Sequence, residues 1–73
     1  MPYVNIKVTG GSEAPTEEQK NELIKGVTDL LVRVLNKNPA ATVVVIDEVP
    51  MENWGIDGES VPVRRKKQAQ TAG

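Results

Sequence analysis

The first segment of the chain alternates apolar and more polar residues. Val4, Ile6 and Val8 occupy every second position. This period of two predicts a β-strand over about residues 3–8. Pro2 lies at the head of that strand, where a residue without an N–H is tolerated because it need not donate a ladder hydrogen bond.

The apolar spacing then changes to three and four residues, which predicts an amphipathic helix over about residues 16–36. Thr16 and Gln19 have the spacing of a capping box at its start, and the sequence Asn-Lys-Asn-Pro at 36–39 ends it. The residues of the apolar stripe are Leu23, Ile24, Val27, Leu30, Leu31, Val34 and Leu35.

A continuous β-branched run, TVVVI at 42–46, predicts a second strand of the kind that is covered on both faces in a parallel sheet. Residues 48–52 contain Pro50 and are interpreted as a loop. The two glycines within 53–58 indicate a turn or hairpin, with a short return strand over 60–63.

These elements predict an α+β fold, a single β-α-β unit with a C-terminal β-hairpin. We expect one domain over residues 1–65 and a flexible, polar tail over 66–73. One helix covers only one face of a two-stranded sheet, and the run at 43–46 would leave apolar side chains exposed on the other. A chain of 73 residues is also small for a stable core. We therefore expect a homo-oligomer, either a dimer or a higher symmetric assembly.

The composition excludes several classes of function. The chain has no Cys and no His, so a disulfide, a His-based triad, a Cys nucleophile and a standard zinc site are absent. Nine basic and ten acidic side chains give a net charge of −1, which argues against nucleic acid as a partner. No apolar run approaches the roughly 20 residues that span a bilayer, and no signal peptide precedes the first strand. We expect a soluble, cytoplasmic protein that contacts no membrane.

Pro2 is the candidate with distinctive chemistry. Removal of Met1, which a small second residue permits, would give Pro2 a free secondary amine. Such an amine is a useful general base when its pKa lies near the working pH, and burial among apolar groups lowers that pKa. The chain offers four apolar walls for this: Val4, Val43, Trp54 and Ile56. On the residues alone, Pro2 is either this base or simply the first residue of a strand.

The charged residues are less distinctive. The sequence RRKK at 64–67 is either a solvated tail or an anion-binding site. Arg64 and Arg65 lie closest to the ordered part of the predicted domain. Four acidic residues are interpreted as lying at the start of the helix, its entrance, and on its solvent-exposed face: Glu13, Glu17, Glu18 and Glu22.

Four segments resemble the 4-oxalocrotonate tautomerase family of the tautomerase superfamily. They are MPYVNIKV, TEEQKNELIKGVTDLLVRVL, TVVVIDEV and NWGIDGESV, which together cover about residues 1–65. The resemblance implies that Met1 is removed and that Pro2 is a general base for proton transfer on a small keto or enol acid. It also implies that Trp54 is an apolar wall of the site, that no cofactor or metal is used, and that the chain forms hexamers, trimers of dimers, with sites at subunit boundaries.

The chain departs from the family at two arginines. The loop after the first strand, TGGSEAPTEE, has no basic residue, and Val43 aligns with the arginine of the second strand. A mono-acid such as a phenylpyruvate-like enol therefore suits this site better than a dicarboxylate. Arg64 and Arg65 are the first candidates to replace the missing cations, followed by Lys7 and Arg33.

Two hairpin groups are further candidates. Asn53 is either a hydrogen-bond donor beside Trp54 or a turn former, and the backbone N–H of Ile56 could stabilise an enolate oxygen.

Two other functions remain open at this point. A hydratase or dehalogenase of the same superfamily would use a cationic Pro2 as acid, with Glu52 or Asp57 activating water. A non-catalytic oligomeric binding module would need none of this chemistry.

Overall fold

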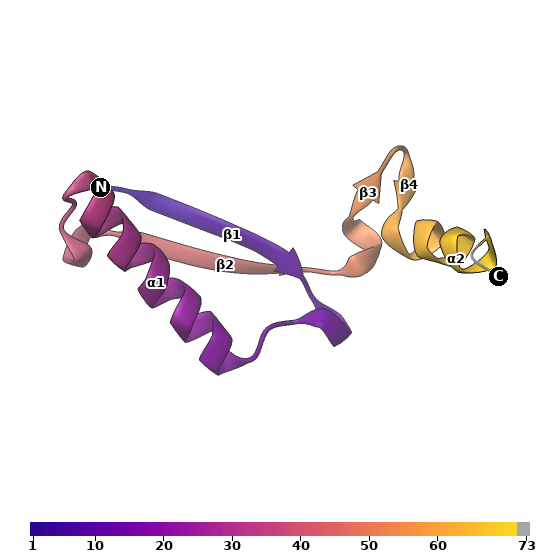
Figure 1. The fold of residues 1–73 in the computed structure, drawn as a ribbon, viewed down its shortest axis with the longest axis horizontal. Coiled ribbons are helices and arrows are strands. Elements are labelled where there is room, and N and C mark those ends of the chain that lie inside the picture. The colour runs from indigo at the N-terminus through magenta and orange to yellow at the C-terminus, as the bar shows by residue number, and fades with distance from the viewer. Residues whose placement is uncertain (72–73) are drawn as a thin grey trace.

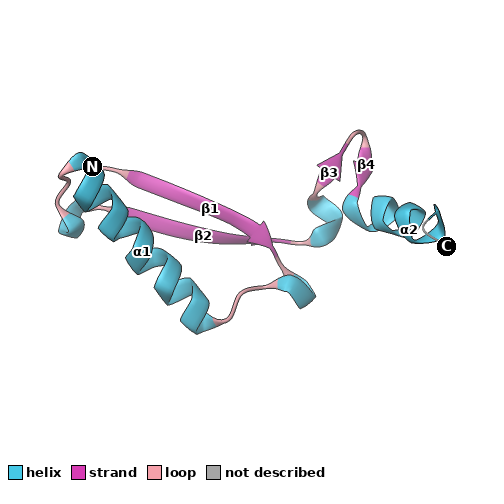
Figure 2. Cartoon of the chain, viewed as in Figure 1, coloured by secondary structure: helices cyan, strands magenta, loops and turns pink. Residues whose placement is uncertain are grey.

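The computed structural model describes residues 1–71 (Figures 1 and 2). It contains two parallel strands with a helix between them, followed by a small hairpin and a second helix. In chain order the elements are β1 (Tyr3–Thr9), η1 (Gly11–Glu13), α1 (Glu17–Leu35), η2 (Pro39–Ala41), β2 (Val43–Val49), η3 (Met51–Asn53), β3 (Gly55–Ile56), β4 (Glu59–Ser60) and α2 (Val61–Thr71).

The two long strands form a parallel pair, which confirms the predicted β-α-β unit. Their register runs from Tyr3 opposite Val43 to Thr9 opposite Val49. Strand β2 extends to Val49, beyond the predicted end at residue 46, so residues 48 and 49 of the predicted loop over 48–52 belong to the strand. Polar pairing on the sheet explains the extension: the amide of Asn5 and the ammonium of Lys7 both donate to Asp47 Oδ2, at 2.7 and 3.1 Å.

Helix α1 begins and ends where its capping residues predict. Thr16 Oγ1 accepts from the backbone N–H of Gln19 at 3.1 Å, and the Gln19 side chain accepts from the backbone N–H of Thr16 at 2.9 Å. This is the predicted capping box. Asn36 ends the helix in the left-handed conformation, with φ of 54°, which asparagine tolerates better than most residues.

Helix α1 covers one face of the sheet only. Lys20 of its first turn pairs with Glu48 of β2, which identifies the covered face. Side chains alternate along a strand, so the residues that flank Glu48 in β2 point to the other face. On that other face, Tyr3 is 64% exposed, Val43 42% and Val45 36%.

The remaining elements form an arm, which we define as residues 51–71. Its hairpin turns at Asp57 and Gly58, which both have positive φ, as a type I′ turn requires. The backbone N–H of Val61 donates to the Trp54 carbonyl at 2.9 Å and adds one rung to this hairpin. Figure 1 shows the arm projecting from the end of the sheet, away from the N-terminus.

Helix α2 differs from the prediction. A return strand was expected over 60–63 and a flexible tail over 66–73, whereas Val61–Thr71 is helical. Pro62 lies in the first turn, where its missing N–H costs no helical hydrogen bond. The Arg, Lys, Gln and Ala residues that follow are good helix formers. Residues 72–73 lie outside the described part.

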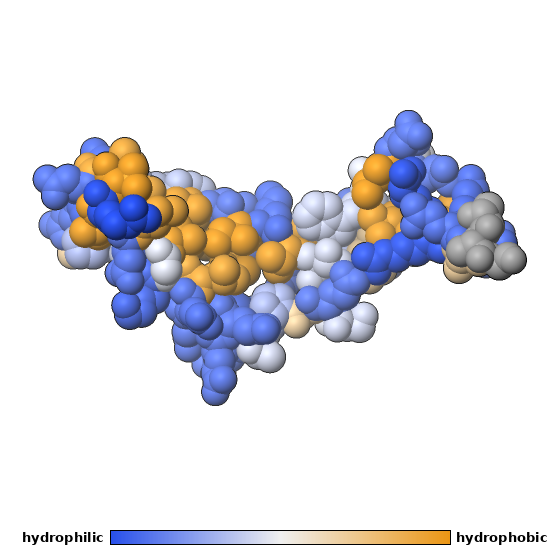
Figure 3. Space-filling view, in the orientation of Figure 1, coloured by the Kyte–Doolittle hydropathy of each residue, from blue (hydrophilic) through white to orange (hydrophobic). Residues whose placement is uncertain are grey.

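The chain is too extended to hold a core of its own. Its radius of gyration is 16.6 Å, compared with about 11 Å for a compact domain of this length. No apolar side chain among the described residues is fully buried. Figure 3 shows apolar residues clustered on the exposed surface of the β-α-β unit. No helix within residues 1–71 combines the length and the apolar character needed to cross a bilayer.

Candidate active site

Pro2 is held at the open end of the sheet, which is the end where β1 and β2 both begin. Its carbonyl accepts a hydrogen bond from the backbone N–H of Val43 at 3.1 Å, so the residue is tied to the first position of β2. Pro2 is half-buried, and Met1 in front of it is 94% exposed. Removal of Met1 would therefore free the Pro2 nitrogen without loss of packing. The structure brings two of the predicted site residues, Pro2 and Val43, together here.

A second group of predicted site residues meets on the arm. A cavity of about 340 Å³ lies between the hairpin, α2 and the end of β1. That volume is within the range of small-molecule sites, about 300–1,000 Å³. Its lining residues are Thr9, Trp54, Ile56, Val61, Arg64, Arg65 and Gln68.

Trp54 is fixed as an apolar wall of this cavity. Its indole Nε1–H donates to the Val49 carbonyl at 3.2 Å, and its backbone N–H donates to Met51 at 3.2 Å. Because the only polar atom of the ring is occupied, the indole presents an apolar surface. Ile56 adds an aliphatic side chain that is 49% exposed.

The backbone of Ile56 is a weaker candidate than its side chain. Ile56 is paired with Glu59 across the two-residue turn. The closing pair of such a turn directs its N–H and C=O groups toward each other. The side chain of Ile56, as a wall beside Trp54, is therefore the better-supported contribution.

The two arginines of the cavity have different partners. Arg65 Nη1 donates to Glu13 Oε2 at 2.8 Å, and Arg65 Nη2 lies 3.5 Å from Glu13 Oε1. The hydrogen bond from Arg65, reinforced by its charge, lowers the pKa of Glu13 below the usual range. Arg64 is half-buried and, within residues 1–71, makes no hydrogen bond or ion pair.

The structure keeps Pro2 and the arm cavity apart within one chain. Thr9, which lines the cavity, follows Pro2 by the full length of β1. Seven residues of strand span about 23 Å. The two groups of predicted residues thus lie at opposite ends of the sheet, and a single copy cannot bring them to one substrate.

The other candidates lie outside both groups. Asn53 is exposed in η3, where its backbone N–H donates to Pro50 at 2.9 Å, as a turn former would. Glu52 and Asp57 are exposed and do not line the arm cavity. Lys7 is paired with Asp47, and Arg33 is exposed near the end of α1.

Four residues of the arm site were not predicted as contributors. Glu13 was interpreted as part of the helix entrance, yet it reaches Arg65 of α2. Thr9, Val61 and Gln68 line the cavity. Val61, Arg64 and Gln68 are spaced by three and four residues, and this spacing would have placed them on one face if a helix had been expected there.

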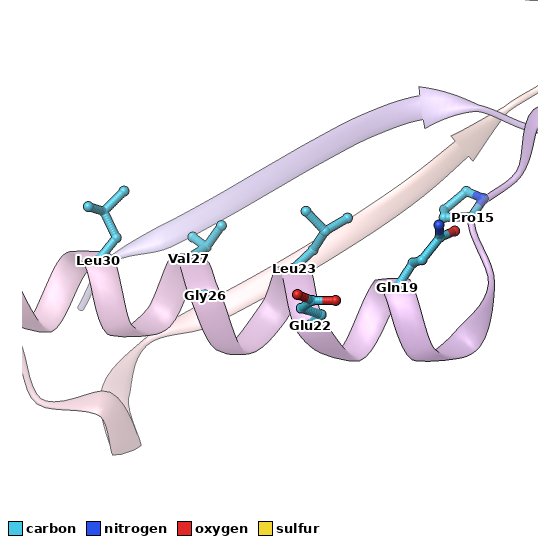
Figure 4. Close-up of a pocket in the computed structure, with 7 residues that line it drawn as sticks. All are labelled: Pro15, Gln19, Glu22, Leu23, Gly26, Val27 and Leu30. Carbon is cyan, nitrogen blue, oxygen red and sulfur yellow. The ribbon is translucent and has the colours of Figure 1, made fainter.

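An apolar groove runs along α1, away from both groups. Figure 4 shows Leu23, Val27 and Leu30 projecting from the same side of the helix, with Glu22 and Gln19 beside them. The groove has a volume of about 660 Å³. Leu30 is 45% exposed and Leu23 39%, so residues 1–71 leave this stripe partly uncovered.

A family model and named relatives agree on the family of this chain. The family model described as "Tautomerase enzyme" matches residues 2–64. A protein of Dickeya dadantii named "Probable tautomerase K2" is 60% identical over 67 residues, which cover 92% of this chain and 97% of that protein. The 2-hydroxymuconate tautomerase of Comamonas testosteroni is 42% identical over 60 residues, which cover 82% and 90% of the two chains.

A solved structure agrees in fold. The crystal structure of DmpI from Helicobacter pylori superposes with a TM-score of 0.79 at 54% identity, over 89% of this chain and 97% of that one. The β-α-β unit and hairpin described above are therefore the fold of that protein too.

Proposed function

This chain belongs to the tautomerase family and is a tautomerase, an isomerase, and on that premise we propose that the secondary amine of Pro2 is its general base. The substrate class we assign is a small 2-keto or 2-hydroxy unsaturated acid. The reaction is a keto-enol or 1,3-type proton transfer. The observation that carries the proposal is the position of Pro2, which is tied to Val43 at the open end of the sheet behind a solvent-exposed Met1.

The mechanism follows from the chemistry of that amine. The neutral nitrogen takes a proton from the enol hydroxyl or from the carbon beside the carbonyl. The resulting ammonium returns the proton to another carbon, so that substrate and product are isomers. The carbonyl of the substrate is the electron sink, so the reaction calls for no cofactor or metal. An amine serves this role best when its pKa lies near the working pH.

The amine needs apolar surroundings that a single copy does not provide. An exposed α-amine has a pKa of about 8, and desolvation lowers it. Trp54 and Ile56 are apolar walls of the kind required, but the length of β1, about 23 Å, separates their end of the sheet from Pro2 of the same chain. We propose that the arm of one copy reaches the Pro2 end of another, so that each active site is shared.

This arrangement requires a homo-oligomer. We favour a hexamer built as a trimer of dimers, and a dimer is the alternative. Three uncovered apolar surfaces support it: the groove on α1, the open face of the sheet and the arm (Figures 3 and 4). Leu30, Val45 and Ile56, one from each surface, are 45%, 36% and 49% exposed. Association would remove these side chains from water, which is the main favourable term in most assemblies.

The domain boundary and location belong to the same proposal. We place the tautomerase domain at residues 1–65, and the family model, which ends at residue 64, supports that boundary. Helix α2 continues past it to Thr71. We also place the protein in the cytoplasm and expect neither nucleic acid nor a membrane as partner.

The test of Pro2 is its replacement by alanine, which keeps a primary amine but changes its basicity and shape. We expect Pro2→Ala to lower kcat/KM by about 100-fold or more, while circular dichroism stays unchanged. Pro50→Ala, the same exchange at an exposed proline after β2, is the matched control. Turnover of an aryl enolpyruvate is followed by its ultraviolet absorbance.

Mass spectrometry completes the test. The purified wild-type chain should lack Met1. A retained methionine would convert the Pro2 nitrogen to an amide, and wild-type turnover by Pro2→Ala would assign the base elsewhere. Either result would overturn the proposal.

A further inference from the structure

The four consecutive cations at the start of α2 are not equivalent. Arg65 is paired with Glu13 at 2.8 Å, and Lys67 with Glu59 at 2.7 Å. Lys66 is exposed and does not line the arm cavity. Arg64 alone among the four is half-buried, and it lines the cavity without a hydrogen bond or ion pair inside residues 1–71. Its charge is therefore available to a ligand.

An unpaired guanidinium beside apolar walls has a specific chemical preference. Partial burial without a partner is unfavourable for a charged group, and the planar fork of arginine matches the two oxygens of a carboxylate. The same cavity is lined by Ile56 and by Trp54, whose indole N–H already donates to the Val49 carbonyl. The cavity thus offers one cationic contact and an apolar enclosure.

The neighbouring pair limits the number of carboxylates that the cavity can hold. Glu13 neutralises Arg65, so the second guanidinium of the cavity is already matched. A second carboxylate on the ligand would find no unpaired cation among the residues that line the cavity. The carboxylate of Glu13, bonded to Arg65, would repel it.

We propose that Arg64 binds the single carboxylate of the substrate, with Trp54 and Ile56 enclosing its apolar body, and that the enzyme therefore selects monocarboxylates over dicarboxylates. The assignment of the ligand as a substrate rests on the function proposed above. The binding itself is testable without turnover, because Trp54 is the only tryptophan of the chain and reports directly on the cavity.

The first experiment titrates Trp54 fluorescence of the full chain with three probes. They are phenylacetate, its neutral analogue phenylacetamide and the dicarboxylate adipate. We expect phenylacetate to bind most tightly and Arg64→Ala to weaken it about tenfold or more, as expected for a charge-assisted contact. Phenylacetamide should bind the two proteins equally. Lys66→Ala is the control: it removes a positive charge two positions after Arg64, at an exposed residue that does not line the cavity, and should leave all three titrations unchanged.

A second variant covers the case in which Arg64→Ala misfolds. Arg64→Lys keeps the positive charge but loses the fork, and we expect it to recover part of the affinity for phenylacetate. Equal phenylacetate affinity in the wild type and a folded Arg64→Ala would overturn the assignment. Tighter binding of adipate than of phenylacetate, or no response of wild-type Trp54 to phenylacetate, would do the same.

Kinetics separate this inference from the role of Pro2. With an aryl enolpyruvate we expect Arg64→Ala to raise KM about tenfold while kcat falls less. Pro2→Ala should lose turnover but titrate phenylacetate like the wild type. An active Pro2→Ala would reject the general base and leave the Arg64 site standing. An unaltered phenylacetate titration in Arg64→Ala would reject the Arg64 site and leave the base standing.

Discussion

Pro2 and Trp54 lie at opposite ends of the β1–β2 sheet, on either side of the seven-residue strand β1, which spans about 23 Å. Both belong to the proposed active site, and the distance exceeds the reach of any side chain. A substrate that meets both residues must therefore lie between two copies of the chain.

A complementation experiment tests this shared site. Pro2→Ala and Trp54→Ala should each be weakly active alone. After unfolding and refolding as an equal mixture, about one quarter of the sites should combine an intact Pro2 with an intact Trp54 if copies pair at random. The measurement is turnover of an aryl enolpyruvate by the mixture. Activity no higher than the average of the separate variants would place both residues in the site of a single chain.

The Glu13–Arg65 ion pair predicts a pH-dependent attachment of the arm. Because Arg65 lowers the pKa of Glu13 in the folded chain, the pair stabilises the arm above the ordinary glutamate pKa of about 4.3. That contribution is lost as the pH falls through the lowered pKa. Glu13→Gln should reduce the hydrogen-exchange protection of α2 at pH 7 and abolish this acid-dependent loss. Both side chains are about half exposed, so the effect should be modest.

Glu18→Gln is the control for that exchange, because Glu18 is exposed in the first turn of α1 and lies outside the pair. Protection factors are corrected for the intrinsic pH dependence of amide exchange. An acid-dependent loss of protection that persists in Glu13→Gln would assign it to another group.

The capping box of α1 predicts a measurable loss of stability. Thr16→Ala removes the hydroxyl that accepts from Gln19, at a cost of about 1 kcal/mol in the free energy of unfolding. Thr16→Ser keeps the acceptor and should recover most of it. Urea unfolding at one fixed chain concentration measures both, since association contributes to stability. Equal destabilisation by alanine and serine would show that the hydroxyl is not the cause.

The local elements could be predicted because their causes are local. Thr16, Gln19 and Asn36 set the limits of α1, and the Asp57-Gly58 pair sets the hairpin. The end of β2 could not be predicted, because Asp47 extends the strand through partners 40 and 42 residues earlier in the chain. Strand pairing of this kind depends on tertiary contacts, which override local propensity.

Some members of the candidate site could be predicted from the sequence, but its geometry could not. Pro2 and Trp54 stand out by residue type and by resemblance to the family, and Arg64 stands out by its charge next to the predicted domain. Their distribution between two ends of the sheet depends on the direction of the arm. The different states of Arg64 and Arg65 depend on Glu13, which is 52 residues away from Arg65. No pattern within a short window of sequence contains that contact.

The most direct measurement is an NMR titration of the Pro2 nitrogen in the assembled, ¹⁵N-proline-labelled protein. A Pro2 amine enclosed by apolar walls of a second copy should have a pKa clearly below the value of about 8 for an exposed α-amine, so that it is largely neutral at pH 7. A pKa at or above that value would contradict the role of Pro2 as general base, because the nitrogen would then be protonated when it must accept a proton.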